Sequence, residues 1–526
     1  MFHGGEHVRE PAAAGNGVSH MEGMPFIPTV PYESWEEWMR VLENVEPREV
    51  MFYFEELSSK HRCSQHEKQA TDYIAEFAEQ RGLRYHRDAL QNIIVRKPGT
   101  PGYENAPAVI LHGHLDMVCK IDEGYAHDFA NGGVRLKLDG NFIRAEGTTL
   151  GADNGLGIAY MLALLDSTDI PHPPLECVMT AMEEMGKVGG DGVDVTLLTG
   201  KRMIDFNWID ERQLLAGCSG DVSCRIRIDP EWETPAAGHS PLAVSIRGLK
   251  GGHCEFDIHF DRANAIVLVG RLLRAAMQVA EVRVATVSGG VQNNVIPADG
   301  DLLLWVRHDQ MDAVEAAIAK LTAVLKNEFR FADPDLRIET RRTQQQIDRV
   351  LSAHATSRLV RIIALLPNGV QTQNLEVPGN WETSNNIGLM VTKSAAIEIV
   401  CTITSAVTSR KHAVLDQIVL LADLAGEGVS AEQIGLDAPE FPWNPYSRML
   451  EIARQSYERV MGRAPDVLVS VCSLELGMFT QRIDGLDTIG IGTNLYDLHS
   501  PKESMDHTSA ARVWPLIKDV MKHLDH

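Results

Sequence analysis

The sequence predicts an α/β protein with a mixed, mostly parallel sheet flanked by helices and a smaller α+β domain inserted into the chain. Three observations predict this fold class. The chain has 526 residues, which is more than one hydrophobic core accommodates and so indicates at least two domains. Short apolar runs alternate with segments of helical periodicity up to about residue 220. From about residue 221 the pattern changes to an alternation of apolar and polar residues.

The elements of the first part follow one another in the order that a parallel sheet requires. The expected helices cover 47–83 and 156–165, and the expected strands cover 91–96, 107–112, 175–182 and 202–206. The second helix is preceded by Asp153-Asn154-Gly155, which are good residues for a helix N-terminus. Strands that alternate with helices form largely parallel sheets.

The middle of the chain is expected to form a separate antiparallel sheet. Alternating strands begin at Val222 and Leu242, and a helix over 262–279 and a pair of strands over 281–307 follow. Leu436–Pro445 is rich in proline and aromatic residues and is a plausible return linker to a final helix and strand. We therefore expect a flexible extension over 1–32, a main domain built from 33–220 and 436–526, and an inserted domain over 221–435.

Composition excludes several classes of function. The net charge of −23 argues against nucleic acid as a partner. No apolar run is long enough to span a membrane, and the N-terminus lacks the features of a secretory signal. The eight cysteines are scattered without a Cys-x-x-Cys pair, so most are expected to be small core residues in a reducing cytoplasm.

Four polar clusters follow predicted strands or begin a predicted helix. They are His114-Leu-Asp116, Asp153-Asn154, Glu183-Glu184 and His499-Ser-Pro. The carboxyl ends of the strands in an open α/β sheet line one crevice, so these side chains can converge. Histidine and carboxylate ligands together suit zinc or a similar divalent ion. Each cluster alone is more typical of a solvated turn or a helix cap, and the metal-site hypothesis depends on all four.

The residue types also predict a division of roles. Asp116 shares a strand face with His114 and can fix the imidazole nitrogen that faces a metal. Of Glu183 and Glu184, one can bind the metal while the other moves a proton. In the inserted domain, His253 follows two glycines and Asn294 lies in Asn-Asn-Val-Ile-Pro. These two side chains could donate hydrogen bonds to an oxyanion or to a substrate carboxylate, although composition alone favours structural roles.

Several strings together resemble one enzyme family. LHGHLDMV, GTTLGADNGLGIA, PPLECVMTAMEEMG, LLAGCSG, LKGGHCEFDIHFDRANA, NNVIPA and LHSPKE resemble the aminoacyl-histidine dipeptidases (Xaa-His dipeptidase, carnosinase-like) of the co-catalytic zinc aminopeptidase, carboxypeptidase and aminoacylase superfamily. The resemblance runs from about residue 47 to the end. It implies a zinc-peptidase-like catalytic domain with an inserted lid, metal-dependent hydrolysis of dipeptides in the cytoplasm, and one or two zinc ions that manganese or cobalt can replace. A homodimer is also implied, because some relatives dimerise through the lid.

The resemblance assigns roles to individual residues. It implies metal ligation by His114, Asp153, Glu184 and His499, with Asp153 shared by two ions. It implies that Asp116 orients His114, that Glu183 is the general base, and that His253 and Asn294 contact the substrate. It also implies a cis peptide bond between Asp153 and Asn154.

Three positions depart from the family pattern. The remaining metal aspartate of the family falls on Asn207, with Asp205 and Asp210 nearby at the wrong spacing. Asp205 shares a predicted strand face with Asn207, so a small shift could place it near the ions. The family arginine that binds a substrate carboxylate falls on Thr404. The string His-Ala-Gly-Leu-Glu is replaced by Val471-Cys-Ser-Leu-Glu475, in which Glu475 is retained and is expected to contact substrate.

These departures leave three functions open. An Asn207 ligand is neutral, so we expect the ion that it shares with His114 to bind weakly or to be absent. The first function is hydrolysis of dipeptides, with Arg410 or Arg448 as unsupported substitutes for the missing arginine. Thr404 favours a second, hydrolysis of another N-acyl amino acid or conjugate. Asn207 favours a third, a catalytically impaired paralogue that binds peptides.

Overall fold

The computed structural model describes residues 40–375, 377 and 379–525. The expected extension over 1–32 lies outside the described residues, as do residues 33–39 of the expected main domain.

The first sheet is built around four parallel strands. They are β3 (Val109–His114), β6 (Leu175–Thr180), β7 (Arg202–Trp208) and β20 (Asp487–Gly492). Two antiparallel strands extend it beyond β6, namely β2 (Ile93–Lys97) and β1 (Arg84–Arg87). On the other side β20 pairs with β8 (Gln213–Ile228), which also pairs in parallel with β19 (Asp466–Ser473). The carboxyl ends of the parallel strands therefore lie at one edge of this sheet, as the alternation of strands and helices predicts.

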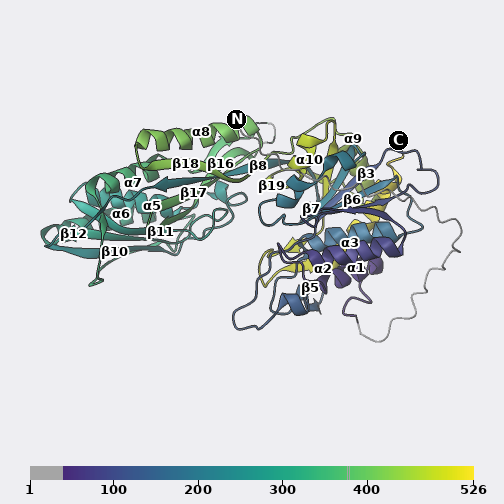
Figure 1. The fold of residues 1–526 in the computed structure, drawn as a ribbon, viewed down its shortest axis with the longest axis horizontal. Coiled ribbons are helices and arrows are strands. Elements are labelled where there is room, and N and C mark those ends of the chain that lie inside the picture. The colour runs from purple at the N-terminus through teal and green to yellow at the C-terminus, as the bar shows by residue number, and fades with distance from the viewer. Residues whose placement is uncertain (1–39, 376, 378, 526) are drawn as a thin grey trace, which may run out of the picture. The chain divides into compact units, whose positions relative to one another are not determined.

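Helices cover both faces of this sheet, and strand alternation decides which residue faces which layer. Val109 and Leu111 of β3 pack into the cluster that includes α1 (Arg48–Ser58), α3 (Ala152–Asp166), α9 (Arg448–Met461) and α11 (His507–Lys522). Ile110 packs into the opposite cluster with α10 (Leu476–Arg482). Figure 1 shows α1 and α3 side by side along the sheet. Further elements of this part are α2 (Lys68–Gln80), α4 (Val188–Gly192), β4 (Leu136–Asp139), β5 (Phe142–Ala145), β21 (Leu495–Tyr496) and β22 (Ser504–Asp506).

The second sheet is antiparallel throughout. Beyond β8 its strand order is β17 (Ile397–Ser405), β16 (Trp381–Thr392), β11 (Val282–Gly289), β12 (Gly300–Arg307), β10 (His239–Arg247) and β13 (Arg337–Arg342), with β18 (Val429–Ala438) on β8 and β15 (Gly369–Gln373) on β16. Its helices are α5 (Ala265–Met277), α6 (Met311–Glu328), α7 (Ala353–Leu365) and α8 (Thr408–Ala425), and a short pair is formed by β9 (Trp232–Glu233) and β14 (Val350–Leu351). Antiparallel pairing agrees with the alternation of apolar and polar residues from about residue 221.

Two separate buried clusters support the division of the chain. One joins residues from 42–216 with residues from 449–524, and the other contains only residues from 222–418. Both lie within one compact unit, Val41–His526, and β8 runs through the expected boundary without a break. We propose that 33–220 with 436–526 and the segment 221–435 are the two domains, and we call the second the lid.

The cysteines follow the expectation with one exception. Six are free and buried, as expected of core residues. Cys63 and Cys119 instead form a disulfide with their Cα atoms 5.5 Å apart, which their spacing of 56 residues did not indicate. Among the described residues, no helix combines the length and apolar character needed to cross a membrane.

Candidate metal centre

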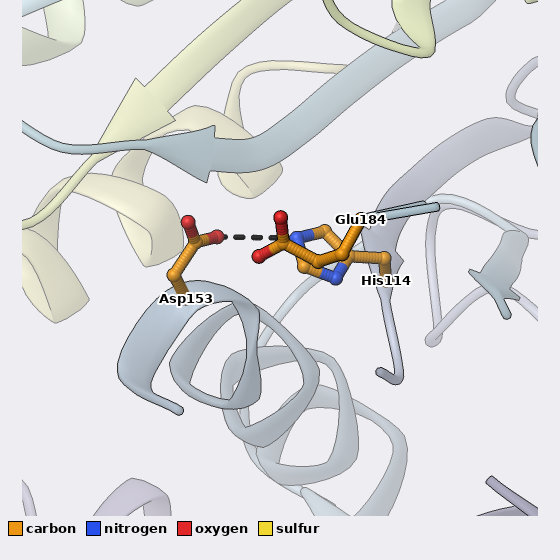
Figure 2. A group of neighbouring side chains, drawn as sticks. All are labelled: His114, Asp153 and Glu184. Carbon is orange, nitrogen blue, oxygen red and sulfur yellow. Dashed lines mark hydrogen bonds and ion pairs between the residues drawn. The ribbon is translucent and has the colours of Figure 1, made fainter. Parts of the chain in front are cut away.

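The structure brings three of the predicted ligands together at one end of the first sheet. His114 ends β3, Asp153 lies in the first turn of α3, and Glu184 follows β6. One nitrogen or oxygen atom from each lies within 4.8 Å of the others (Figure 2). His114 Nε2 is 3.1 Å from Asp153 Oδ1. The peptide bond after Asp153 is cis, as the resemblance implies.

His499, the fourth predicted ligand, lies beside the same carboxylates. Its Nε2 atom is 2.8 Å from Glu184 Oε1 and 3.4 Å from Asp153 Oδ2. Both His499 Nε2 and Glu184 Oε1 are buried, yet neither has a hydrogen-bond partner of suitable geometry. Buried polar atoms normally have a partner, so two such atoms 2.8 Å apart fit the ligands of a shared cation.

The electrostatics of the cluster also favour a cation. Burial alone would lower the pKa of His499, but the carboxylates of Asp153 and Glu184 raise it to about 10. The pKa of His114 is likewise raised well above its usual value, by Asp116, Asp153 and Glu183 against the effect of burial. The carboxylates therefore attract positive charge strongly at this position, and a divalent ion would supply it.

Asp116 fixes the orientation of His114 and of the segment that carries both glutamates. His114 Nδ1 lies 3.1 Å from the backbone oxygen of Asp116 and 3.4 Å from its Oδ1 atom, so Nδ1 carries the hydrogen and Nε2 is free to bind a metal. The backbone N–H groups of Glu183 and Glu184 donate to the Asp116 carboxylate at 3.0 and 3.2 Å, and the Ser64 hydroxyl donates to it at 2.7 Å. One buried carboxylate thus aligns two of the predicted ligand segments.

Glu183 is a partly buried carboxyl group whose proton is exchangeable near neutral pH. Burial raises its pKa to about 8, with His114 opposing this shift and the carboxylates of Glu184 and Glu475 adding to it. A carboxyl group that exchanges its proton near neutral pH is suited to general acid–base catalysis.

His253 and Asn294, the two lid residues predicted to contact substrate, lie on adjoining segments. The Cys254 N–H, next to His253, donates to the backbone oxygen of Asn294 at 2.9 Å. His253 Nδ1 accepts the N–H of Glu255 at 3.2 Å, so the neutral ring carries its hydrogen on Nε2. Burial lowers the pKa of His253, and the charge of His499 lowers it further, so both effects favour the neutral ring. Its Nε2–H group is therefore available as a hydrogen-bond donor.

Neither neighbouring aspartate replaces the missing metal aspartate. Asp205 is 1% exposed and its Oδ1 atom is 2.7 Å from His112 Nδ1, so the expectation that a small shift brings it near the ions is wrong. Asp210 is paired with Arg212 at 2.7 Å. Asn207 lies next to the cis peptide, where its Oδ1 atom accepts the Asn154 amide at 3.2 Å. Within the described residues, the group of metal-binding type therefore contains two carboxylates and not three.

Glu475 is placed differently from the expected substrate contact. It is 1% exposed, and its carboxylate accepts the Thr180 hydroxyl and the Gly190 N–H, both at 2.6 Å. Its Oε2 atom is also 3.1 Å from His112 Nε2. Glu475 therefore bonds to His112, Thr180 and Gly190 of the protein itself. No pattern in the sequence predicted that His112 is buried between Asp205 and Glu475.

The position of the missing arginine is buried and acidic. Thr404 is 3% exposed, and its hydroxyl donates to Glu255 Oε1 at 3.4 Å. Arg410 is half exposed and paired with Glu382 at 2.8 Å. Lys187, which the sequence did not single out, is a nearby cation whose Nζ atom lies 3.0 Å from Asp221 Oδ1 and whose charge interacts with Glu255.

Comparisons with known proteins agree with this geometry. Residues 244–333 match the family model of the M20 peptidase dimerisation domain. The chain is 30% identical over 489 residues to the cytosol non-specific dipeptidase of Escherichia coli K12, covering 92% of this chain and 99% of that protein. The structure of an aminoacylhistidine dipeptidase from Vibrio alginolyticus is 30% identical, with a TM-score of 0.78, and covers 91% of this chain and 97% of that one. The aminopeptidase PepT of Bacillus cereus shares the fold at 14% identity, with a TM-score of 0.52 over 92% of this chain and all of that one. The chain therefore belongs to the M20 family of metallopeptidases.

Proposed function

We propose that this metallopeptidase hydrolyses dipeptides and that His114, Asp153, Glu184 and His499 hold its metal. The observation that supports this most strongly is the convergence of these four side chains, which come from segments up to 385 residues apart, beside Glu183. The names of the relatives in Escherichia coli and Vibrio alginolyticus, both dipeptidases, support the substrate class.

We assign zinc as the metal, because imidazole nitrogens and carboxylate oxygens are its usual ligands. Asp153, Glu184 and His499 would hold one ion tightly. A second ion would depend on His114, Asp153 and Asn207 and would bind more weakly, because Asn207 offers a neutral oxygen where a carboxylate would balance charge. Manganese and cobalt are plausible substitutes at both positions.

The residues of the site divide the reaction between them. A bound divalent ion polarises the peptide carbonyl and lowers the pKa of the attacking water. Glu183 takes a proton from that water and passes it to the departing amine. The His253 Nε2–H group donates a hydrogen bond to the oxyanion of the tetrahedral intermediate, and Asn294 helps to hold the substrate. Asp116 keeps the Nε2 atom of His114 directed at the metal.

The comparisons also support an assembly and a location for the protein. The match of residues 244–333 to a dimerisation domain supports a homodimer formed through the lid. The cytosolic relative supports a cytosolic location, in which the Cys63–Cys119 disulfide would be exposed to reductants.

A second candidate function is hydrolysis of another N-acyl amino acid or conjugate by the same mechanism. The buried pair of Thr404 and Glu255 favours a conjugate that lacks a free carboxylate, because this pair cannot bind a substrate carboxylate as an arginine would.

A hydrolysis panel distinguishes these functions. Dipeptides and N-acyl amino acids are incubated with the protein and zinc, manganese or cobalt, and the released amine is measured. We expect cleavage of dipeptides by the wild type and by Glu123→Gln, a control at an exposed glutamate, and a loss of at least about 100-fold in kcat for Glu183→Gln. Cleavage that survives Glu183→Gln would contradict the mechanism, and cleavage of N-acyl amino acids alone would favour the second function.

A further inference from the structure

Glu503 holds the loop that carries Asp153. Its carboxylate is 3% exposed and lies against four consecutive backbone N–H groups. Oε2 accepts those of Leu150 and Gly151 at 2.9 and 3.0 Å, and Oε1 accepts those of Ala152 and Asp153 at 2.9 and 3.5 Å. Three of these four residues are buried, so their N–H groups have no water to bind and require an acceptor from the protein.

The position of Glu503 in the chain connects two ligand segments. It lies four residues after His499, whereas the segment it holds, residues 150–153, leads into the first turn of α3 and contains Asp153. His499 and Asp153 approach one another to 3.4 Å. Because one carboxylate bonds the backbone of the Asp153 loop from within the His499 segment, it fixes the separation of these two side chains.

Arg62 binds one backbone carbonyl group of the same segment, that of Gly151, and one that follows His114. Its guanidinium is 1% exposed and donates to the backbone oxygens of Leu115, at 3.1 Å, and of Gly151. Gly151 has a φ of 71°, and a Cβ atom there would clash with the Arg62 guanidinium, so the loop approaches it too closely for a side chain. Arg62 and Glu503 also attract one another electrostatically.

We propose that Glu503 is a positioning residue for the metal centre, which it serves by fixing the Asp153 loop against the His499 segment with the help of Arg62. This inference rests on the proposed function, in which Asp153 and His499 bind the same ion. Both Glu503 oxygens accept backbone N–H groups, so Glu503 acts through Asp153 and not as a ligand itself. Its contribution is to hold the ligands in the geometry that the ion requires before the ion binds.

Glu503→Gln tests the proposal, because an amide can accept hydrogen bonds on only one side. Its NH2 group must face two of the four N–H donors, whichever way it turns. The matched control is Glu176→Gln. Glu176 is also a buried carboxylate, and it accepts the N–H groups of Thr199 and Gly200 at 3.0 Å at the opposite end of β6 from the ligands.

Zinc affinity of the full chain is measured by competition with a chromophoric chelator, after circular dichroism has shown that each metal-free variant is folded. Hydrogen exchange at the amides of 150–153 is followed in the metal-free protein. We expect Glu503→Gln to bind zinc about 10- to 100-fold more weakly and to exchange these amides faster. The Glu176→Gln variant should lose thermal stability, because a buried hydrogen-bond acceptor is lost. Its zinc affinity should change less than about twofold, because Glu176 lies far from the metal ligands.

Unchanged zinc affinity in Glu503→Gln would overturn the proposal, and so would an equal loss in Glu176→Gln. If Glu503→Gln does not fold, Glu503→Asp replaces it, with Glu176→Asp as its control. The shorter carboxylate keeps the charge but cannot reach both pairs of donors. Zinc affinity should therefore fall several-fold in Glu503→Asp and stay unchanged in Glu176→Asp. A wild-type protein that binds no zinc would instead contradict the proposed function.

Discussion

Asp116→Asn tests whether the metal ligands are held by the carboxylate behind them. Asp116 is fully buried, and its two oxygens serve two pairs of neighbours. Oδ1 accepts the Glu183 N–H and faces His114 Nδ1, while Oδ2 accepts the Ser64 hydroxyl and the Glu184 N–H. An asparagine keeps the shape but can accept on only one side.

The structure predicts which of the two Asp116 oxygens is replaced by the NH2 group of the asparagine. The Ser64 hydroxyl can turn and accept a hydrogen bond, whereas a backbone N–H cannot, so the amide NH2 group should face Ser64 and leave the Glu184 N–H without an acceptor. An unpaired buried donor costs about 1–3 kcal/mol of folding free energy. The loss of negative charge behind His114 also makes its Nε2 atom a weaker ligand, which typically lowers metal affinity about 10- to 100-fold.

Three measurements on metal-free and zinc-loaded protein separate these effects. Urea unfolding of the metal-free protein gives the loss of folding free energy, a zinc titration gives the affinity, and dipeptide hydrolysis gives kcat and KM. Asp139→Asn, at an exposed ion pair with Arg144, is the control and should change none of them appreciably. Wild-type zinc affinity in Asp116→Asn would refute the assignment of Asp116 as the residue that orients His114.

Three further predictions address other parts of the structure. Asn207→Asp should tighten binding of a second zinc ion and raise kcat, as measured by zinc titration and hydrolysis; no change in either would show that Asn207 is not at the metal centre. Reduction of Cys63–Cys119, which closes a loop of 56 residues, should lower the free energy of unfolding by up to about 4 kcal/mol, and a Cys63→Ser, Cys119→Ser double variant should not respond to a thiol reductant in urea unfolding. Burial lowers the pKa of His172 to about 4, below its value in the unfolded chain, so stability should fall as the pH drops from 6.5 to 4. His172→Gln should reduce this pH-dependent fall in the free energy of unfolding by roughly 3 kcal/mol, as measured by urea unfolding at several pH values. An equal reduction in His86→Gln, which replaces an exposed histidine, would show that the burial of His172 is not the cause.

Much of the fold and of the candidate centre could be predicted from the sequence because both depend on strand periodicity. His114, Glu184 and His499 follow predicted strands, and residues at the carboxyl ends of parallel strands meet at one edge of a sheet. Asp153 precedes a predicted helix whose apolar residues are evident. The alternation in the middle of the chain likewise predicted the antiparallel lid.

Irregular backbone and long-range pairing explain what the sequence did not predict. Asp205 and Asn207 were expected on one strand face, but β7 has one residue more than β20 between two paired positions, with Asp205 opposite Gly490 and Trp208 opposite Gly492. This bulge breaks the alternation on which the expectation depended. Glu503 is an isolated glutamate in a loop, so neither period nor spacing marks it as a partner of the Asp153 loop.

A crystal structure of the protein soaked with zinc, with anomalous data collected at the zinc edge, tests the central claim most directly. The account predicts a strong anomalous peak in contact with Asp153, Glu184 and His499, at the ligand distances of about 2.0–2.2 Å that zinc requires, and a weaker peak beside His114. Anomalous density elsewhere on the chain with none among these four side chains would contradict it.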